Sequence, residues 1–268
     1  DAARRGCRRV RRTDARGRYS IRYKPVGGEG VYFASSSYGG VAYFTAPLPA
    51  GDAAGDAGEI TVFDTTSSPI PIHTRGRHLV VSASGVDGRR TLVEVFELSN
   101  DTTLTAVAGA RGHATWSASV PPNASGFEVG QSDIGADAVQ FRDGRVLVYA
   151  SLSPGIRQVA FSYSVPASDF PLALPVHESV GVLEVLIEDP GATATGGGLA
   201  EQAPVSLEGR RFRRFLSQEV KDGSTVTVNV GEPTAPRGNR FVLLPVLAAA
   251  AIMALALAVA LTRRRPVR

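Results

Sequence analysis

The sequence predicts an all-β protein, with two or three small β-sandwich modules followed by one C-terminal transmembrane helix. Three observations predict this class. Apolar side chains alternate with polar ones, Asp-Gly and Pro-Gly turns separate the alternating runs, and a span of 22 uncharged residues lies near the C-terminal end. The length of 268 residues allows one or two domains, or three small ones.

Between residues 13 and 235 the spacing of apolar side chains has a period of two and no helical period. In the run 158–165 the even-numbered residues face one way. The odd-numbered residues, which are all apolar, face the other: Val159, Phe161, Tyr163 and Val165. Residues 183–187 and 225–230 repeat the pattern. Such runs predict strands with one face in a core and the other in water.

Turn residues indicate how these strands are joined. Asp-Gly pairs at 87–88, 143–144 and 222–223 each separate two β-rich runs, and glycine supplies the positive φ that a two-residue hairpin needs. Pro-Gly at 154–155 joins two further runs in the same way. The turns therefore predict antiparallel hairpins in sandwiches rather than a parallel sheet.

Stretches rich in Pro, Gly and Ser set the expected boundaries, at 49–58, 66–71, 166–175 and 231–239. The first and third modules are small for independent sandwiches, which leaves open that they share cores with the second. The predicted divisions are a disordered or truncated Arg-rich leader at 1–12, modules at 13–66, 77–166 and 172–231, a stalk at 232–240, a transmembrane helix at 241–262 and a basic tail at 263–268.

Charge is distributed unevenly along the chain. Residues 1–24 carry ten basic side chains and the last six residues carry four, whereas residues 25–262 carry 15 basic and 23 acidic ones. An acidic body would repel phosphate, which excludes a nucleic-acid-binding domain. The single Cys excludes an intrachain disulfide and a Cys-based metal site.

The C-terminal span predicts where the protein resides. A helix over 241–262 would be about 33 Å long, enough to cross a hydrocarbon core of about 30 Å. Arginines dominate the side that follows the span, so the positive-inside rule places the tail in the cytoplasm and residues 1–240 outside the membrane. With 27 Arg to two Lys, the composition is typical of a GC-rich bacterial genome. The alternative is a sorting tail that is removed, although neither an LPxTG nor a Pro-Glu-Pro motif precedes the span.

One stretch resembles a known family. Residues 13–21, TDARGRYSI, look like the "TDxxGxYxF" hairpin of carboxypeptidase regulatory-like domains, which are transthyretin-like β-sandwiches. Residues 31–34 and 38–40 suit that family's next strand and turn, so the resemblance covers 13–65. It implies a partial, non-catalytic accessory module. The later modules resemble immunoglobulin-like sandwiches.

Candidate chemical sites are few. No HExxH or other close metal spacing occurs among the four histidines, which favours surface or loop positions for them, and no GxSxG motif accompanies His177. We therefore predict no catalytic residue, cofactor or metal. Arg210, Arg211, Arg213 and Arg214 surround two phenylalanines, a pattern typical of an exposed edge strand. The triple glycine at 196–198 lacks the Lys of a P-loop and predicts a flexible loop.

The most distinctive candidates for partner binding lie near the N-terminus: Tyr32, Tyr38, Tyr43, Phe44, Asp52 and Asp56. Together with Phe33 and Trp116 these aromatic residues could form a carbohydrate-stacking platform, although core packing is the commoner role. The sequence thus predicts a non-enzymatic envelope protein that binds or scaffolds a protein complex. A membrane-anchored hydrolase or metal-dependent enzyme and a carbohydrate-binding module remain as alternatives, and a glycan stays open as a ligand.

Overall fold

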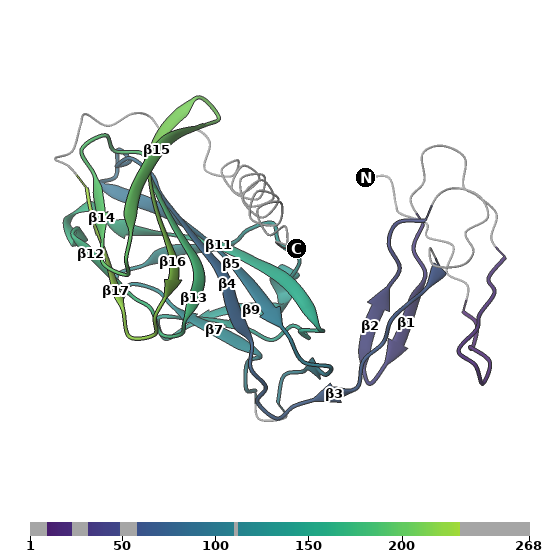
Figure 1. The fold of residues 1–268 in the computed structure, drawn as a ribbon. Coiled ribbons are helices and arrows are strands. Elements are labelled where there is room, and N and C mark those ends of the chain that lie inside the picture. The colour runs from purple at the N-terminus through teal and green to yellow at the C-terminus, as the bar shows by residue number, and fades with distance from the viewer. Residues whose placement is uncertain (1–9, 23–31, 49–57, 110–111, 231–268) are drawn as a thin grey trace, which may run out of the picture. The chain divides into compact units, whose positions relative to one another are not determined.

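The computed structural model describes residues 10–22, 32–48, 58–109 and 112–230 (Figure 1). These residues are all-β, as predicted: besides strands they contain the 3-10 turns η2 (Ala136–Ala138) and η3 (Ala167–Asp169), and no α-helix. Asp52, Asp56, the stalk, the predicted transmembrane helix and the tail lie outside the described residues. Within the described ranges, no helix is long and apolar enough to span a membrane. The chain divides into two compact units, 1–62 and 63–268.

The described residues of the N-terminal unit include a two-stranded hairpin, β1 (Ser35–Tyr38) and β2 (Val41–Phe44). Gly39 and Gly40 join the strands with φ of 56° and 80°, the two positive values that a type I′ turn requires. Near the start of the chain, the TDARG stretch forms a tight turn in which the Asp14 side chain accepts hydrogen bonds from the backbone N–H groups of Arg16 and Arg18.

A seven-stranded sheet forms the centre of the larger unit. In spatial order its strands are β15 (Ala200–Leu207), β16 (Arg210–Val220), β13 (Val180–Ile187), β4 (His73–Val81), β5 (Arg89–Asn100), β11 (Gly155–Pro166) and β8 (Ser125–Val129). All neighbours pair antiparallel except β4 and β13, which are parallel. The predicted antiparallel pairing therefore describes most of this sheet, and the β4–β13 pair is an exception that the sequence did not predict. The turn signals identify only strands that follow each other, whereas β4 and β13 meet after a long crossover.

Three smaller sheets are also present in the described part of this unit. They are β7 (Trp116–Ser119), β10 (Arg145–Val148) and β9 (Val139–Arg142); β12 (Leu172–Pro175), β17 (Thr225–Asn229) and β14 (Thr193–Thr195); and the parallel pair β3 (Thr65–Thr66) and β6 (Thr105–Ala106). Both three-stranded sheets share one hydrophobic cluster with a face of the large sheet. Strands from 77–166 and 172–231 thus share a sheet and a core, the arrangement that the small size of the third range left open.

The two faces of the large sheet differ from the predicted pattern in one respect. The row of odd-numbered residues on β11 is buried in the main core, as alternation predicts. The opposite face is not simply in water, because Ala160 is also buried. On that face Phe212 of β16 packs with Val80, Val93 and Leu186, and two residues of β15 cover this second cluster. Small apolar residues there gave no sequence signal of burial.

The predicted turns form where expected, but only some of them join paired strands. Asp143 and Gly144 both have positive φ and connect β9 to its neighbour β10. The Asp-Gly turn at 222–223 leads instead from β16 to β17, which lies in another sheet, and the Pro-Gly turn at 154–155 similarly leads from β10 to β11. A turn residue determines the local φ, and it does not determine which strand becomes the partner.

Candidate functional site

The exposed face of the β1–β2 hairpin carries two large aromatic side chains. Phe44 is 64% exposed and Phe33 is 59% exposed. Phe44 pairs with Ser35, so these two side chains lie on the same face. Phe33 precedes Ser35 by two residues in extended chain, and exposure alternates through residues 32–37, which places Phe33 on that face as well. We call this face the phenylalanine face.

Within the hairpin, the residues beside the two rings are small and uncharged. Ser35, Ser37 and Ala42 occupy the rest of the phenylalanine face, and no charged residue occurs between Glu29 and Asp52. The opposite face of the hairpin is buried through Val41, Tyr43 and Thr45. The glycine turn fixes this register, and a slip by one residue would exchange the buried and exposed side chains.

The predicted partner-binding residues divide accordingly. Phe44 and Tyr38, which is 46% exposed, are accessible. Tyr32 is half-buried, and the burial of Tyr43 makes it part of the packing of the hairpin. Phe33 was predicted only as a member of the possible carbohydrate-stacking platform. Its exposure becomes clear once the pairing of β1 with β2 is known, because that pairing places it among the exposed alternate residues.

Trp116 does not belong to an exposed aromatic platform. Its indole is buried and packs edge-on against Phe96, with the ring centroids 4.8 Å apart. Its Nε1 donates a hydrogen bond of 3.3 Å to Glu178, which also accepts one from Thr74. Core packing, the commoner role of an aromatic residue in a strand, is therefore the role of Trp116.

A buried polar network crosses the main core. Glu94 on β5 is fully buried; its Oε2 accepts from Nε of Arg77 on β4 at 2.9 Å, and its Oε1 accepts from the hydroxyl of Tyr163 at 2.6 Å. Burial, and then the charge of Glu94, raise the pKa of Tyr163, which keeps the phenol protonated as a donor. Each charge has its partner within the network, so the arrangement is suited to stabilising the core.

His78 forms the centre of a second network, on the opposite face of the large sheet. Its Nδ1 lies 2.9 Å from Oε2 of Glu184, and the Oε1 of that carboxylate accepts from Nε of Arg214 at 2.6 Å. Burial would raise the pKa of Glu184, but hydrogen bonds and charge from His78 and Arg214 lower it below its ordinary value. The expectation of a surface position was wrong for His78. Its side chain is buried on the face of the second cluster, where Glu184 of the adjacent strand provides a hydrogen-bond partner for its ring.

The other three histidines, His73, His113 and His177, are exposed. Across the described ranges, no three His, Cys, Asp or Glu side chains lie close enough to hold a metal ion. The His78–Glu184 pair is closed off from solvent and is not presented to a substrate.

The arginines of β16 are largely engaged by carboxylates. Arg210 pairs with Glu188, Arg213 with Glu201 at 2.7 Å, and Arg214 with Glu184. The prediction that this strand is an exposed edge was wrong, because β15 covers it on one side and β13 on the other. Two of these ion pairs join β16 to a neighbouring strand, through Glu201 on β15 and Glu184 on β13, and Glu188 directly follows β13.

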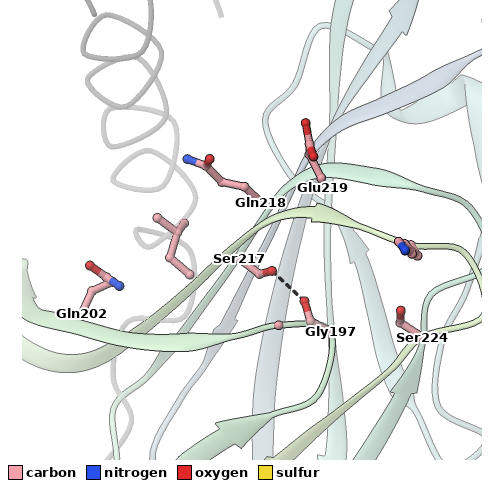
Figure 2. A pocket seen from close by; sticks show the side chains of 9 residues that line it. Gly197, Gln202, Ser217, Gln218, Glu219 and Ser224 are labelled. Atoms are coloured by element: carbon pink, nitrogen blue, oxygen red, sulfur yellow. Dashed lines mark hydrogen bonds between the residues drawn. The ribbon is translucent and has the colours of Figure 1, made fainter.

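A polar pocket of about 630 Å³ lies between the triple-glycine loop and β16 (Figure 2). Its lining is Gly197, Gly198, Gln202, Leu216, Ser217, Gln218, Glu219, Lys221 and Ser224. Neither His78 nor Glu184 lines it. Nothing in the spacing of these residues predicted that they would meet, because they come from β15, β16 and two loops.

The chain matches no protein-family model, and a search of curated proteins finds no relative.

Proposed function

We propose that this chain is a non-enzymatic, membrane-anchored protein of a bacterial cell envelope that binds a partner protein through the phenylalanine face. The observation that carries the proposal is the exposure of Phe33 and Phe44 on one uncharged face. Aromatic residues are enriched at protein interfaces, whereas charged residues are depleted from their centres. Burying one exposed phenylalanine in a complex contributes about 1.5–3 kcal/mol.

The anchor is the second part of the proposal. Residues 241–262 contain no charge, and Arg263, Arg264, Arg265 and Arg268 follow them. The positive-inside rule then puts residues 1–240 outside the membrane and the tail in the cytoplasm. A stalk of nine residues at 232–240 reaches at most about 30 Å, so the body would stay near the membrane surface.

The fold family forms the third part. The tight turn at Asp14 and the hairpin that follows support a partial carboxypeptidase regulatory-like module at 13–65. In the larger unit, a sheet that shares its core with two smaller sheets supports an immunoglobulin-like sandwich. Both assignments are non-catalytic scaffolds, which agrees with the proposed binding role.

The binding role is tested by co-purification of the full chain from detergent-solubilised membranes. The double variant Phe33→Ser, Phe44→Ser should lose the proteins that co-purify with the wild-type chain. Val86→Ser is the matched control, because Val86 is an exposed apolar residue in the larger unit. Equal recovery of partners by the double variant and the control would refute binding through this face.

The topology is tested independently by adding protease to cells with a permeabilised outer membrane. We expect digestion of the body and protection of an epitope tag placed after residue 268. Protection of the body while the same protease removes a known external marker would overturn the proposed orientation.

A further inference from the structure

We infer that the pocket between the triple-glycine loop and β16 binds a neutral sugar unit of a glycan. This site lies in the larger unit and is independent of the phenylalanine face. Three features carry the inference: the fixed shape of the glycine loop, the kind of groups that line the pocket, and the backbone conformation of Glu219.

The glycine loop is held in one conformation by close packing. Gly196, Gly197 and Gly198 all have positive φ, and a Cβ at Gly196 would lie 2.1 Å from the carbonyl oxygen of Thr225. Only glycine fits this approach. Ser217 donates a 2.6 Å hydrogen bond to the carbonyl of Gly197 and so ties the loop to β16 (Figure 2). One wall of the pocket is therefore formed before any ligand arrives, which lowers the entropic cost of binding.

The lining groups match the hydrogen-bonding pattern of a sugar. Two side-chain amides, at Gln202 and Gln218, and the hydroxyl of Ser224 can both donate and accept, as sugar hydroxyls do. In the described part of the chain, the side chains of Gln218, Glu219, Lys221 and Ser224 have no hydrogen-bond or ion-pair partner. Leu216 adds one apolar side chain that can contact the C–H groups of a sugar ring.

Other ligand classes fit the pocket less well. Glu219 and Lys221 contribute opposite charges, so the lining carries no net charge that would select a phosphate or a cation. A single apolar residue gives too little surface for an acyl chain. The volume of about 630 Å³ lies within the range of about 300–1,000 Å³ that is usual for small-ligand sites.

Glu219 has an unusual conformation for a residue inside a strand. Its φ is 53°, and the pairing of β16 with β13 omits it, with Gln218 opposite Val182 and Val220 opposite Val180. Gln218 and Glu219 are both exposed, so the in-and-out alternation of the strand is interrupted at Glu219. The left-handed backbone conformation is energetically unfavourable for a residue other than glycine, and residues held in it are found more often at binding sites.

The test is a titration of the full chain, kept in a detergent without a sugar headgroup, with a panel of neutral sugars. The panel contains glucose, galactose, mannose and N-acetylglucosamine, each as the monosaccharide and as a β-1,4- or α-1,4-linked trimer. Binding is measured by saturation-transfer difference NMR. We expect saturable binding of at least one member below about 10 mM, and weakening of about tenfold in the double variant Gln218→Ala, Ser224→Ala.

The matched control is Gln140→Ala, Ser151→Ala, which removes exposed groups of the same kinds far from the pocket lining in the sequence. It should bind like the wild type. Thermal unfolding of both variants checks that they fold, and Gln202→Ala supplies a second pocket variant should the first not fold. The inference is overturned when no sugar binds saturably, or when pocket and control variants bind equally. Loss of partner proteins in the Phe33→Ser, Phe44→Ser variant has no bearing on this outcome.

Discussion

The two units of the chain use aromatic residues in opposite ways. In the larger unit Phe161 is fully buried; its ring stacks on Phe96 at 5.8 Å between centroids and packs at a tilt against Phe127 at 5.7 Å. In the N-terminal hairpin Phe44 also belongs to a row of alternate side chains on one face of a strand, but it is 64% exposed. The difference lies in the presence of a second layer of strands. The same alternation produces a core where another sheet covers it and a candidate binding face where none of the described strands does.

The sharpest test of this comparison is the loss of one phenyl ring from each unit. Phe161→Ala should lower the free energy of unfolding by about 3–5 kcal/mol, because it leaves a cavity among packed rings. Phe44→Ala should change it by about 0.5 kcal/mol or less, as an exposed side chain does. Differential scanning calorimetry of the full chain measures both. A large loss of stability in Phe44→Ala would show that the phenylalanine face is packed and would break the comparison.

The buried carboxylate of the larger unit gives the next test. Glu94→Ala leaves Arg77 charged and buried without its partner, and should cost about 3–5 kcal/mol. Urea unfolding followed by Trp116 fluorescence measures this, since the only tryptophan reports on the larger unit alone. The control is Arg75→Ala, which removes an exposed ion pair with Asp101 and should leave the unfolding midpoint almost unchanged. Similar midpoints for the two variants would contradict the role of the network.

Substitutions at two glycines separate the energetic cost of a steric clash from the cost of an unfavourable backbone conformation. Gly209→Ala should cost about 1–2 kcal/mol, because its φ is 75° but a Cβ there would meet nothing within 4 Å. Gly196→Ala should cost clearly more, because the new Cβ would also clash with the backbone at Thr225. The same fluorescence assay ranks the two. Equal costs would mean that the loop relaxes away from β17, which would also weaken the argument for a preformed pocket.

The smallest effect concerns pH. Because the pKa of Glu184 is lowered in the folded protein, its carboxylate contributes stability that is present above its ordinary pKa of 4.5. That contribution is lost as the pH falls through the lowered pKa of the folded state. Urea midpoints measured from about pH 7 down to about pH 3 should therefore fall less steeply for Glu184→Gln than for the wild type. Parallel profiles would show that His78 and Arg214 do not stabilise the ionised carboxylate.

Local features were predictable from the sequence, and associations over long distances were not. Alternation correctly identified the core side of β11, and the Asp-Gly pair at 143–144 correctly identified a hairpin. The parallel pairing of β4 with β13 left no local signal, because strand pairing depends on side chains far apart in the chain. For the same reason the sequence did not predict the contact between His78 and Glu184, or that the residues lining the polar pocket would lie together. Exposure of Phe33 required the register of β1 with β2.

The parallel pairing also has a consequence for biosynthesis. His78 on β4 and Glu184 on β13 are 106 residues apart, so one edge of β4 has no partner until β13 has been synthesised. At a translation rate of about 5–20 residues per second, that interval lasts about 5–20 s. An unpaired strand edge of nascent chain is prone to associate with other chains. A chaperone that prevents aggregation of this protein would therefore be expected to act on residues 73–81 during that interval.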